Sequence, residues 1–163
     1  MESPSKRLAA AARRLEHEVP EAPWVLRALA AHPGDFGAVS VLLLNLVELA
    51  PGEALYQEAG LLHAYLQGTG IELMANSDNV LRGGLTEKRV DVAELLRVVD
   101  CTAAPPRRVA PAAGSGEEQV YVTPAAEFRL SRLPLRGRWA PGPRSGIELW
   151  ILTEGAAQAQ WSG

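Results

Sequence analysis

Glycine and proline interrupt the middle of this chain so often that neither a long helix nor a long strand fits there. The interruptions between residues 51 and 84 are Pro51-Gly52, Gly60, Gly68, Gly70 and Gly83-Gly84. Glycine favours tight turns because it adopts positive φ angles without a steric penalty. Short strand-like runs separated by such turns are typical of antiparallel barrels or sandwiches. We therefore predict a mainly β fold, with short antiparallel strands from about Val41 to Ser77.

The segments on either side of this region are predicted to be helical. Apolar residues recur at helical spacing near residues 6–18 and near residues 23–31, and prolines separate the two segments. A third helix is predicted near residues 91–99, because Asp91 and Glu94 form a capping box ahead of an apolar run. The short strands should therefore be flanked by helices.

Four parts are expected along the chain. Residues 1–40 form a helical lead-in, and residues 41–102 carry the first strands and the helix that follows them. Residues 103–118 are rich in proline, alanine, glycine and serine and predict a linker. Residues 119–163 alternate as strands do and predict the start of a second, incomplete strand set.

Composition excludes several classes of partner. The net charge of −3 offers no basic surface for nucleic acid or another polyanion. The longest apolar run, Leu8 to Ala12, is far too short to span a membrane. A single cysteine, Cys101, forms no internal disulfide, which predicts a reducing, cytoplasmic compartment. A small molecule is the expected ligand, and the oligomeric state is left open.

One histidine lies within a recognisable spacing. The chain reads Gly52, five residues, Glu58, one residue, Gly60, two residues, His63, three residues, Gln67. This spacing resembles the second motif of cupin (jelly-roll) barrels, with Glu58 in place of proline and Gln67 in place of asparagine. A glycine three residues before the histidine allows a tight turn that aims the imidazole into a barrel mouth, where it is a good zinc ligand. The alternative is a hydrogen-bonded histidine at a strand end.

The residues that follow the histidine resemble a much longer signature. The run H-A-Y-L-Q-G-T-G-I-E-L-M-A-N-S-D-N-V-L-R-G-G-L-T-E-K-R-V-D-V, residues 63–92, is similar to the C-terminal signature of type I phosphomannose isomerases. The upstream P-G-D and L-L-L-N elements are similar as well. The resemblance is strong over about residues 24–100 and looser elsewhere. Glu58 and Glu87 depart from the family, which usually has proline at both positions.

The resemblance implies a fold, an activity and a set of site residues. It implies a cupin-type barrel that interconverts mannose 6-phosphate and fructose 6-phosphate with the help of zinc. In that family the matching histidine, here His63, is one of four protein ligands to the metal. The tyrosine that matches Tyr65 lines the sugar pocket, and Glu72, Asp78 and Arg82 match further pocket residues.

Aldose–ketose isomerisation needs the kinds of groups that this signature contains. It moves a proton between adjacent carbons through an enediol, with a base near the carbon and positive charge near the oxygen. Glu72 or Asp78 could be the base, and zinc or Arg82 could supply the charge. Arg82 and Lys88 together could hold a phosphate. The alternatives are a solvated strand carboxylate for Glu72, a turn or cap for Asp78, and a surface position for Lys88.

The remaining zinc ligands of that family, a glutamine, a histidine and a glutamate, come from a first jelly-roll half far upstream. Only about forty residues precede the first strand expected here. The family pattern also has closing strands of the second half that are not expected within residues 119–163. The chain therefore resembles a truncated piece of the enzyme. Three hypotheses follow: an isomerase or the part that supplies half of its site, a non-catalytic cupin-like module that binds a sugar phosphate or a partner chain, or an inactive fragment.

Overall fold

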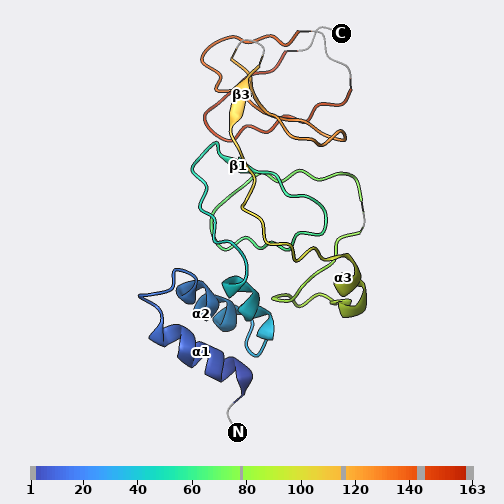
Figure 1. Ribbon diagram of the computed structural model, residues 1–163. Helices are drawn as coiled ribbons and strands as arrows, with labels where there is room; N and C mark the ends of the chain where they lie inside the picture. Colours follow the sequence, from blue (N-terminus) through green and yellow to red (C-terminus); the bar gives the residue numbers. More distant parts are fainter. Residues whose placement is uncertain (1–2, 78, 115–116, 143–145, 161–163) are drawn as a thin grey trace.

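The computed structural model describes residues 3–77, 79–114, 117–142 and 146–160. Figure 1 shows the chain stacked in three levels, with the N-terminal helices at one end, residues of the glycine-rich middle next, and the later strands at the other end. None of the helices within the described ranges has the length and hydropathy that crossing a membrane requires.

The first two helices form close to the predicted ranges, although α1 ends at Arg14 and residues 15–18 form turns. Helix α1 (Pro4–Arg14) begins after Ser3, whose hydroxyl accepts a hydrogen bond from the backbone N–H of Lys6 at 3.4 Å. Helix α2 (Ala22–Ala31) has proline in its first turn and ends before His32. Proline suits a first turn because the N–H that it lacks would have no partner there.

The hydrophobic core of the chain lies between these helices. Ala12, Ala22 and Val25 are buried, and Val25 is 0% exposed. Alanine at the contact lets the two helix backbones approach closely, and burial of the Val25 side chain contributes roughly 1.5–3 kcal/mol. Five partly buried residues pack against this centre: Leu8, Val19, Leu26, Leu29 and Val41. The lead-in is therefore a small packed unit.

The strand predicted to begin at Val41 is wrong. Val41 is instead part of a 3₁₀ helix, η1 (Phe36–Leu42), and residues 43–53 contain no strand. Asp35 caps η1 by accepting the Gly37 N–H at 2.7 Å, and Ala38 is buried. Local capping and packing against the helices thus outweigh the β propensity of the apolar run. The predicted Pro51-Gly52 turn is confirmed, with Gly52 at a φ of 91°.

The strands that do form are short and antiparallel. Strand β1 (Ala54–Leu55) pairs with β2 (Arg108–Val109). Strands β3 (Pro111–Ala113), β4 (Gln119–Tyr121) and β5 (Leu130–Arg132) form a three-stranded sheet in that order. Strands β4 and β5 lie in the region predicted to form strands after residue 119, but no described residue from 133 to 160 belongs to a strand, so that prediction is met only in part.

Part of the predicted linker is also β structure. Strands β2 and β3 both lie within residues 103–118, where proline and alanine concealed any strand pattern. Pairing with distant partners, Ala54 opposite Val109 and Ala112 opposite Val120, orders this segment. The domain boundaries stay a prediction, but the segment between them is more than a linker.

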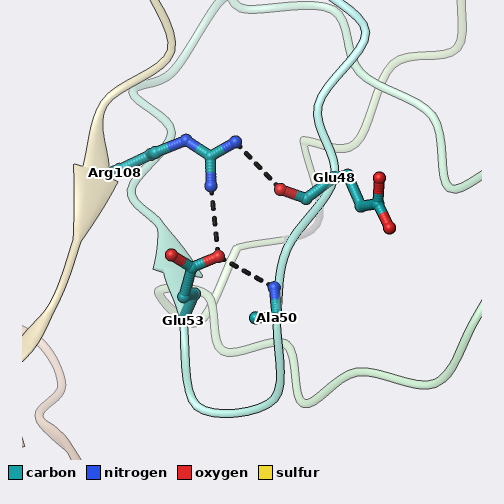
Figure 2. Close-up of polar contacts among 4 residues, drawn as sticks. All are labelled: Glu48, Ala50, Glu53 and Arg108. Atoms are coloured by element: carbon teal, nitrogen blue, oxygen red, sulfur yellow. Dashed lines mark hydrogen bonds and ion pairs between the residues drawn. The ribbon is translucent and has the colours of Figure 1, made fainter.

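A charged network holds the β1–β2 pair together. The carboxylate of Glu53 accepts from the backbone N–H of Ala50 at 2.8 Å and from the Arg108 guanidinium at 3.2 Å (Figure 2). The same guanidinium donates to the Glu48 carbonyl at 2.8 Å. Arg108 therefore bridges both sides of the turn that precedes β1.

The described residues confirm antiparallel sheets with flanking helices and form no closed barrel. Helix α3 (Val92–Val98) is present as predicted, and the Glu94 N–H donates to its cap residue Asp91 at 3.1 Å. Between β1 and α3, however, no described residue belongs to a strand. Contacts between single peptide groups, such as the Tyr56 N–H to the Arg107 carbonyl at 3.0 Å, replace continuous ladders there. The mainly β expectation is thus met only in part, and the cupin barrel stays a prediction.

Candidate functional site

The turn before His63 forms as the glycine spacing predicts. Gly60 has a φ of 86°, and its carbonyl accepts from the backbone N–H of Asp100 at 2.9 Å. A Cβ at Gly60 would lie 2.9 Å from the Val98 carbonyl oxygen, so only glycine fits both the angle and the space. The turn is thereby fastened to the C-terminal end of α3.

The Leu61 carbonyl favours one tautomer of the His63 ring. The His63 Nδ1 lies 3.2 Å from that carbonyl oxygen, which can only accept, so the two form a hydrogen bond in the tautomer that carries its hydrogen on Nδ1. In the neutral imidazole Nε2 is then an electron-pair donor, and it lies 3.9 Å from Oε1 of Glu72. A backbone carbonyl on Nδ1 is the usual support for a histidine that binds metal through Nε2.

Tyr65 joins His63 and Glu72 in a cluster, called the His63 cluster below. The Tyr65 and His63 rings meet edge to face, with centroids 5.9 Å apart. Partial burial raises the pKa of the Tyr65 hydroxyl, and a hydrogen bond to Glu72 and the charge of that carboxylate raise it further. Since Tyr65 is 76% exposed, water screens most of the energy behind this shift. The cluster thus lies at the surface, open to a solute.

Arg82 lies on a loop, residues 82–85, that packs beside the histidine. A Cβ at Gly83 would lie 3.2 Å from the Leu62 side chain, the immediate neighbour of His63. Gly84 and Leu85 continue the loop with positive φ angles of 130° and 51°. The structure therefore brings the Arg82 loop next to the segment that carries His63, although the contacting residues Gly83 and Leu62 are 21 positions apart in the sequence.

The structure does not join Lys88 to this group. Among the described residues, neither the Lys88 nor the Arg82 side chain has a hydrogen bond or ion pair, and the Lys88 backbone N–H donates to the Thr86 hydroxyl at 3.1 Å. Asp78 lies outside the described residues. That Arg82 and Lys88 face one cavity with His63 stays a prediction.

The described residues supply only part of a zinc site. A catalytic zinc ion takes about three protein ligands. Over residues 3–77, 79–114, 117–142 and 146–160, no three side chains of the metal-binding types come together. His63 Nε2 and the neighbouring Glu72 oxygen provide two donors of suitable chemistry. His63 fits the role of one ligand, and the described part of the chain does not complete the set.

Two contributors to this region were missed by sequence reasoning. One is the Leu61 carbonyl, a backbone group that no residue pattern reveals. The other is Asp35, whose carboxylate accepts from the Leu85 N–H at 2.7 Å and so reaches the Arg82 loop from the helical lead-in. Its position in the P-G-D element was the available signal. The motif residues Glu58 and Gln67 instead bind arginines, Arg107 at 3.3 Å and Arg27 at 3.0 Å.

Comparison with known proteins identifies the class of the relatives: they are isomerases. A mannose-6-phosphate isomerase of Escherichia coli is 38% identical over 144 residues, covering 86% of this chain and 37% of that protein. The one of Salmonella typhimurium is 45% identical over 112 residues, 67% of this chain and 29% of its own length. The one of Cryptococcus neoformans is 40% identical over 147 residues, 86% of this chain and 34% of its own length.

By sequence the chain belongs to the mannose-6-phosphate isomerase family, and it spans about a third of the length of these relatives. No family model matches it, and no solved structure matches it either.

Proposed function

We propose that the chain contributes the sugar-phosphate side of a zinc-dependent isomerase site that interconverts mannose 6-phosphate and fructose 6-phosphate. The observation that carries the proposal is the His63 cluster, because it unites a metal-binding nitrogen, a carboxylate and a hydroxyl on one exposed surface. The names of the relatives supply the substrate. We place the cluster in the cupin-type barrel that the family resemblance implies.

His63 is the residue of this chain that would hold the metal. Its hydrogen-bonded Nδ1 and open Nε2 favour this role. When bound, zinc supplies positive charge beside the oxygens of the reacting sugar carbons.

Glu72 is the candidate base. In the forward direction it takes the proton from C2 of the open-chain sugar and returns it to C1, while the O2 hydroxyl loses a proton and O1 gains one. We assign to Tyr65, whose hydroxyl pKa is raised in part by Glu72, the role of holding a sugar hydroxyl during this exchange. Asp78 is the other candidate base, and the choice between the two carboxylates stays open.

Arg82 is proposed to bind the negative charge of the substrate, either on the phosphate or on the enediolate oxygen. Its side chain makes no ion pair with the described residues, so a ligand would meet a guanidinium that is not already neutralised. Lys88 would add a second cation for the phosphate. Phosphate binding by a guanidinium is bidentate, which fixes orientation as well as charge.

The test is a titration of the purified chain with mannose 6-phosphate, followed by NMR at the Arg82, Tyr65 and His63 resonances. Mannose 6-phosphate should shift all three, whereas inorganic phosphate should shift Arg82 and leave Tyr65 unmoved. Binding without isomerisation in any zinc-loaded form of the protein would favour the non-catalytic sugar-phosphate module. No shift with either ligand would contradict the proposal.

A further inference from the structure

We infer that Asp35 is a positioning residue for Arg82: the helical lead-in holds the phosphate-binding loop in place. This inference rests on the proposed function, since it assigns a purpose to a contact between the lead-in and that loop. Asp35 itself does not touch the substrate in this view. It acts through the backbone of residues 84 and 85.

Both carboxylate oxygens of Asp35 are used. Oδ1 accepts from the Gly37 N–H and Oδ2 from the Leu85 N–H, each at 2.7 Å, and both bonds are partly buried. Hydrogen bonds to an ionised carboxylate are about twice as strong as those between neutral groups. One carboxylate therefore caps η1 and, 50 residues further along the chain, anchors the Arg82 loop.

The backbones meet closely at this anchor. A Cβ at Gly37 would lie 3.4 Å from the Gly84 Cα and 2.9 Å from Oδ1 of Asp35. Leu85 has a φ of 51°, and among the described residues it is the sole non-glycine with positive φ. A leucine adopts this conformation only where its surroundings impose it. The Leu85 N–H donates to Asp35 at the position where the chain takes this conformation.

The consequence for Arg82 is that its loop is held at two points. Gly83 packs against Leu62 on the side of the His63 cluster, and Leu85 is bound to Asp35 on the side of the lead-in. A guanidinium on a fixed backbone loses less freedom when it binds a phosphate, which raises affinity. The lead-in thus raises the phosphate affinity of the site, although none of its side chains touches the ligand.

The test compares Asp35→Asn with Asp91→Asn in the full chain. Asparagine replaces one carboxylate oxygen by an NH2 group that can only donate, so in this geometry it can accept from Gly37 or from Leu85 but not from both. Asp91 caps α3 through one backbone N–H, so Asp91→Asn is a matched control that should behave as the unmodified chain. Two quantities are measured by NMR: hydrogen exchange of the Leu85 amide, and the dissociation constant for inorganic phosphate, followed at the backbone amides of residues 83–85.

Asp35→Asn should speed Leu85 exchange and weaken phosphate binding about tenfold, the effect expected of one hydrogen bond to a charged group. In an Arg82→Ala background the same substitution should have no further effect on phosphate affinity, because the two residues act as one unit. An equal loss in both backgrounds, or unchanged phosphate affinity despite faster exchange, would overturn the inference and leave the proposed function standing. If the unmodified chain binds neither phosphate nor mannose 6-phosphate, the proposed function fails and the positioning role fails with it.

Discussion

The Tyr121 hydroxyl donates a 2.7 Å hydrogen bond to the Gly52 carbonyl and so fastens the three-stranded sheet to the turn that precedes β1. Tyr121 is only 8% exposed, which makes this one of the few buried contacts outside the helical core. The bond spans 69 residues of sequence.

Tyr121→Phe should lower the free energy of unfolding by about 1–2 kcal/mol, because it removes one hydrogen bond and leaves the Gly52 carbonyl partly buried without that partner. Urea unfolding followed by fluorescence measures the change. Tyr56→Phe is a suitable control, since the structure gives no hydrogen bond to the Tyr56 hydroxyl among the described residues. Equal stability of the Tyr121 variant and the parent chain would contradict the importance of this contact.

Zinc binding by residues 1–163 should be weak. Metal affinity depends on several ligands placed together, and the described residues bring only Glu72 near His63. We expect far less than one zinc per chain by atomic absorption and no measurable formation of fructose 6-phosphate by this polypeptide alone. Stoichiometric zinc with turnover would show that the site is completed in another way, such as across a dimer.

The substitutions His63→Ala and Arg82→Ala should have different effects in any form of the protein that isomerises its substrate, because His63 is proposed to bind the metal and Arg82 to stabilise negative charge. His63→Ala should lose zinc and activity together. Arg82→Ala should keep its zinc and lose rate by about a hundredfold or more, as expected when a preorganised charge is removed. Zinc content and kcat are measured on the same samples, and normal zinc in the His63 variant would exclude the ligand role.

The Tyr65 hydroxyl should titrate above its ordinary pKa of 10.0, because burial and Glu72 both favour the neutral phenol. A pKa raised by folding means that the folded state binds this proton more tightly than the unfolded state. Any stabilisation is thus complete below pH 10 and is lost as the pH rises through the folded-state pKa. Glu72→Gln should move the titration back toward 10.0 without reaching it, since burial remains. Phenolate absorbance, with Tyr65→Phe to assign the signal, checks this.

The late apolar run, residues 147–152, should promote self-association. Ile147 and Leu149 are 103% and 84% exposed, and no residue of this run belongs to a strand. Exposed apolar residues with unpaired backbone groups are a common cause of association. Leu149→Lys should therefore reduce the associated fraction in sedimentation experiments and leave the melting temperature unchanged. Leu43→Lys, at another exposed leucine, is the control.

The helices and turns could be predicted from sequence because their causes are local. A cap residue, a proline in the first turn or a glycine with positive φ decides the structure within a few positions, as at Asp91 and Gly60. The strand expected at Val41 failed because burial against helices α1 and α2 depends on distant contacts. The strands β2 and β3 were missed for the same reason.

The site was predictable in part. The neighbourhood of His63, Tyr65 and Glu72 follows from one continuous signature, since all three lie within ten residues. The support from the Leu61 carbonyl and from Asp35 could not be predicted from the sequence, because one is a backbone atom and the other acts across 50 residues. Residue types reveal which groups can react, and the fold decides which groups hold them.

The pairing of β1 with β2 closes a long loop of the chain, residues 56–107. Every site residue that the structure describes lies within this loop: His63, Tyr65, Glu72, Arg82 and Lys88. The two ends of the loop lie side by side, because β1 and β2 are antiparallel. The entropy cost of closing such a loop grows only slowly with its length. The site residues therefore belong to one loop that is closed at its base and tied to the helical lead-in by the Asp35–Leu85 and Arg27–Gln67 hydrogen bonds.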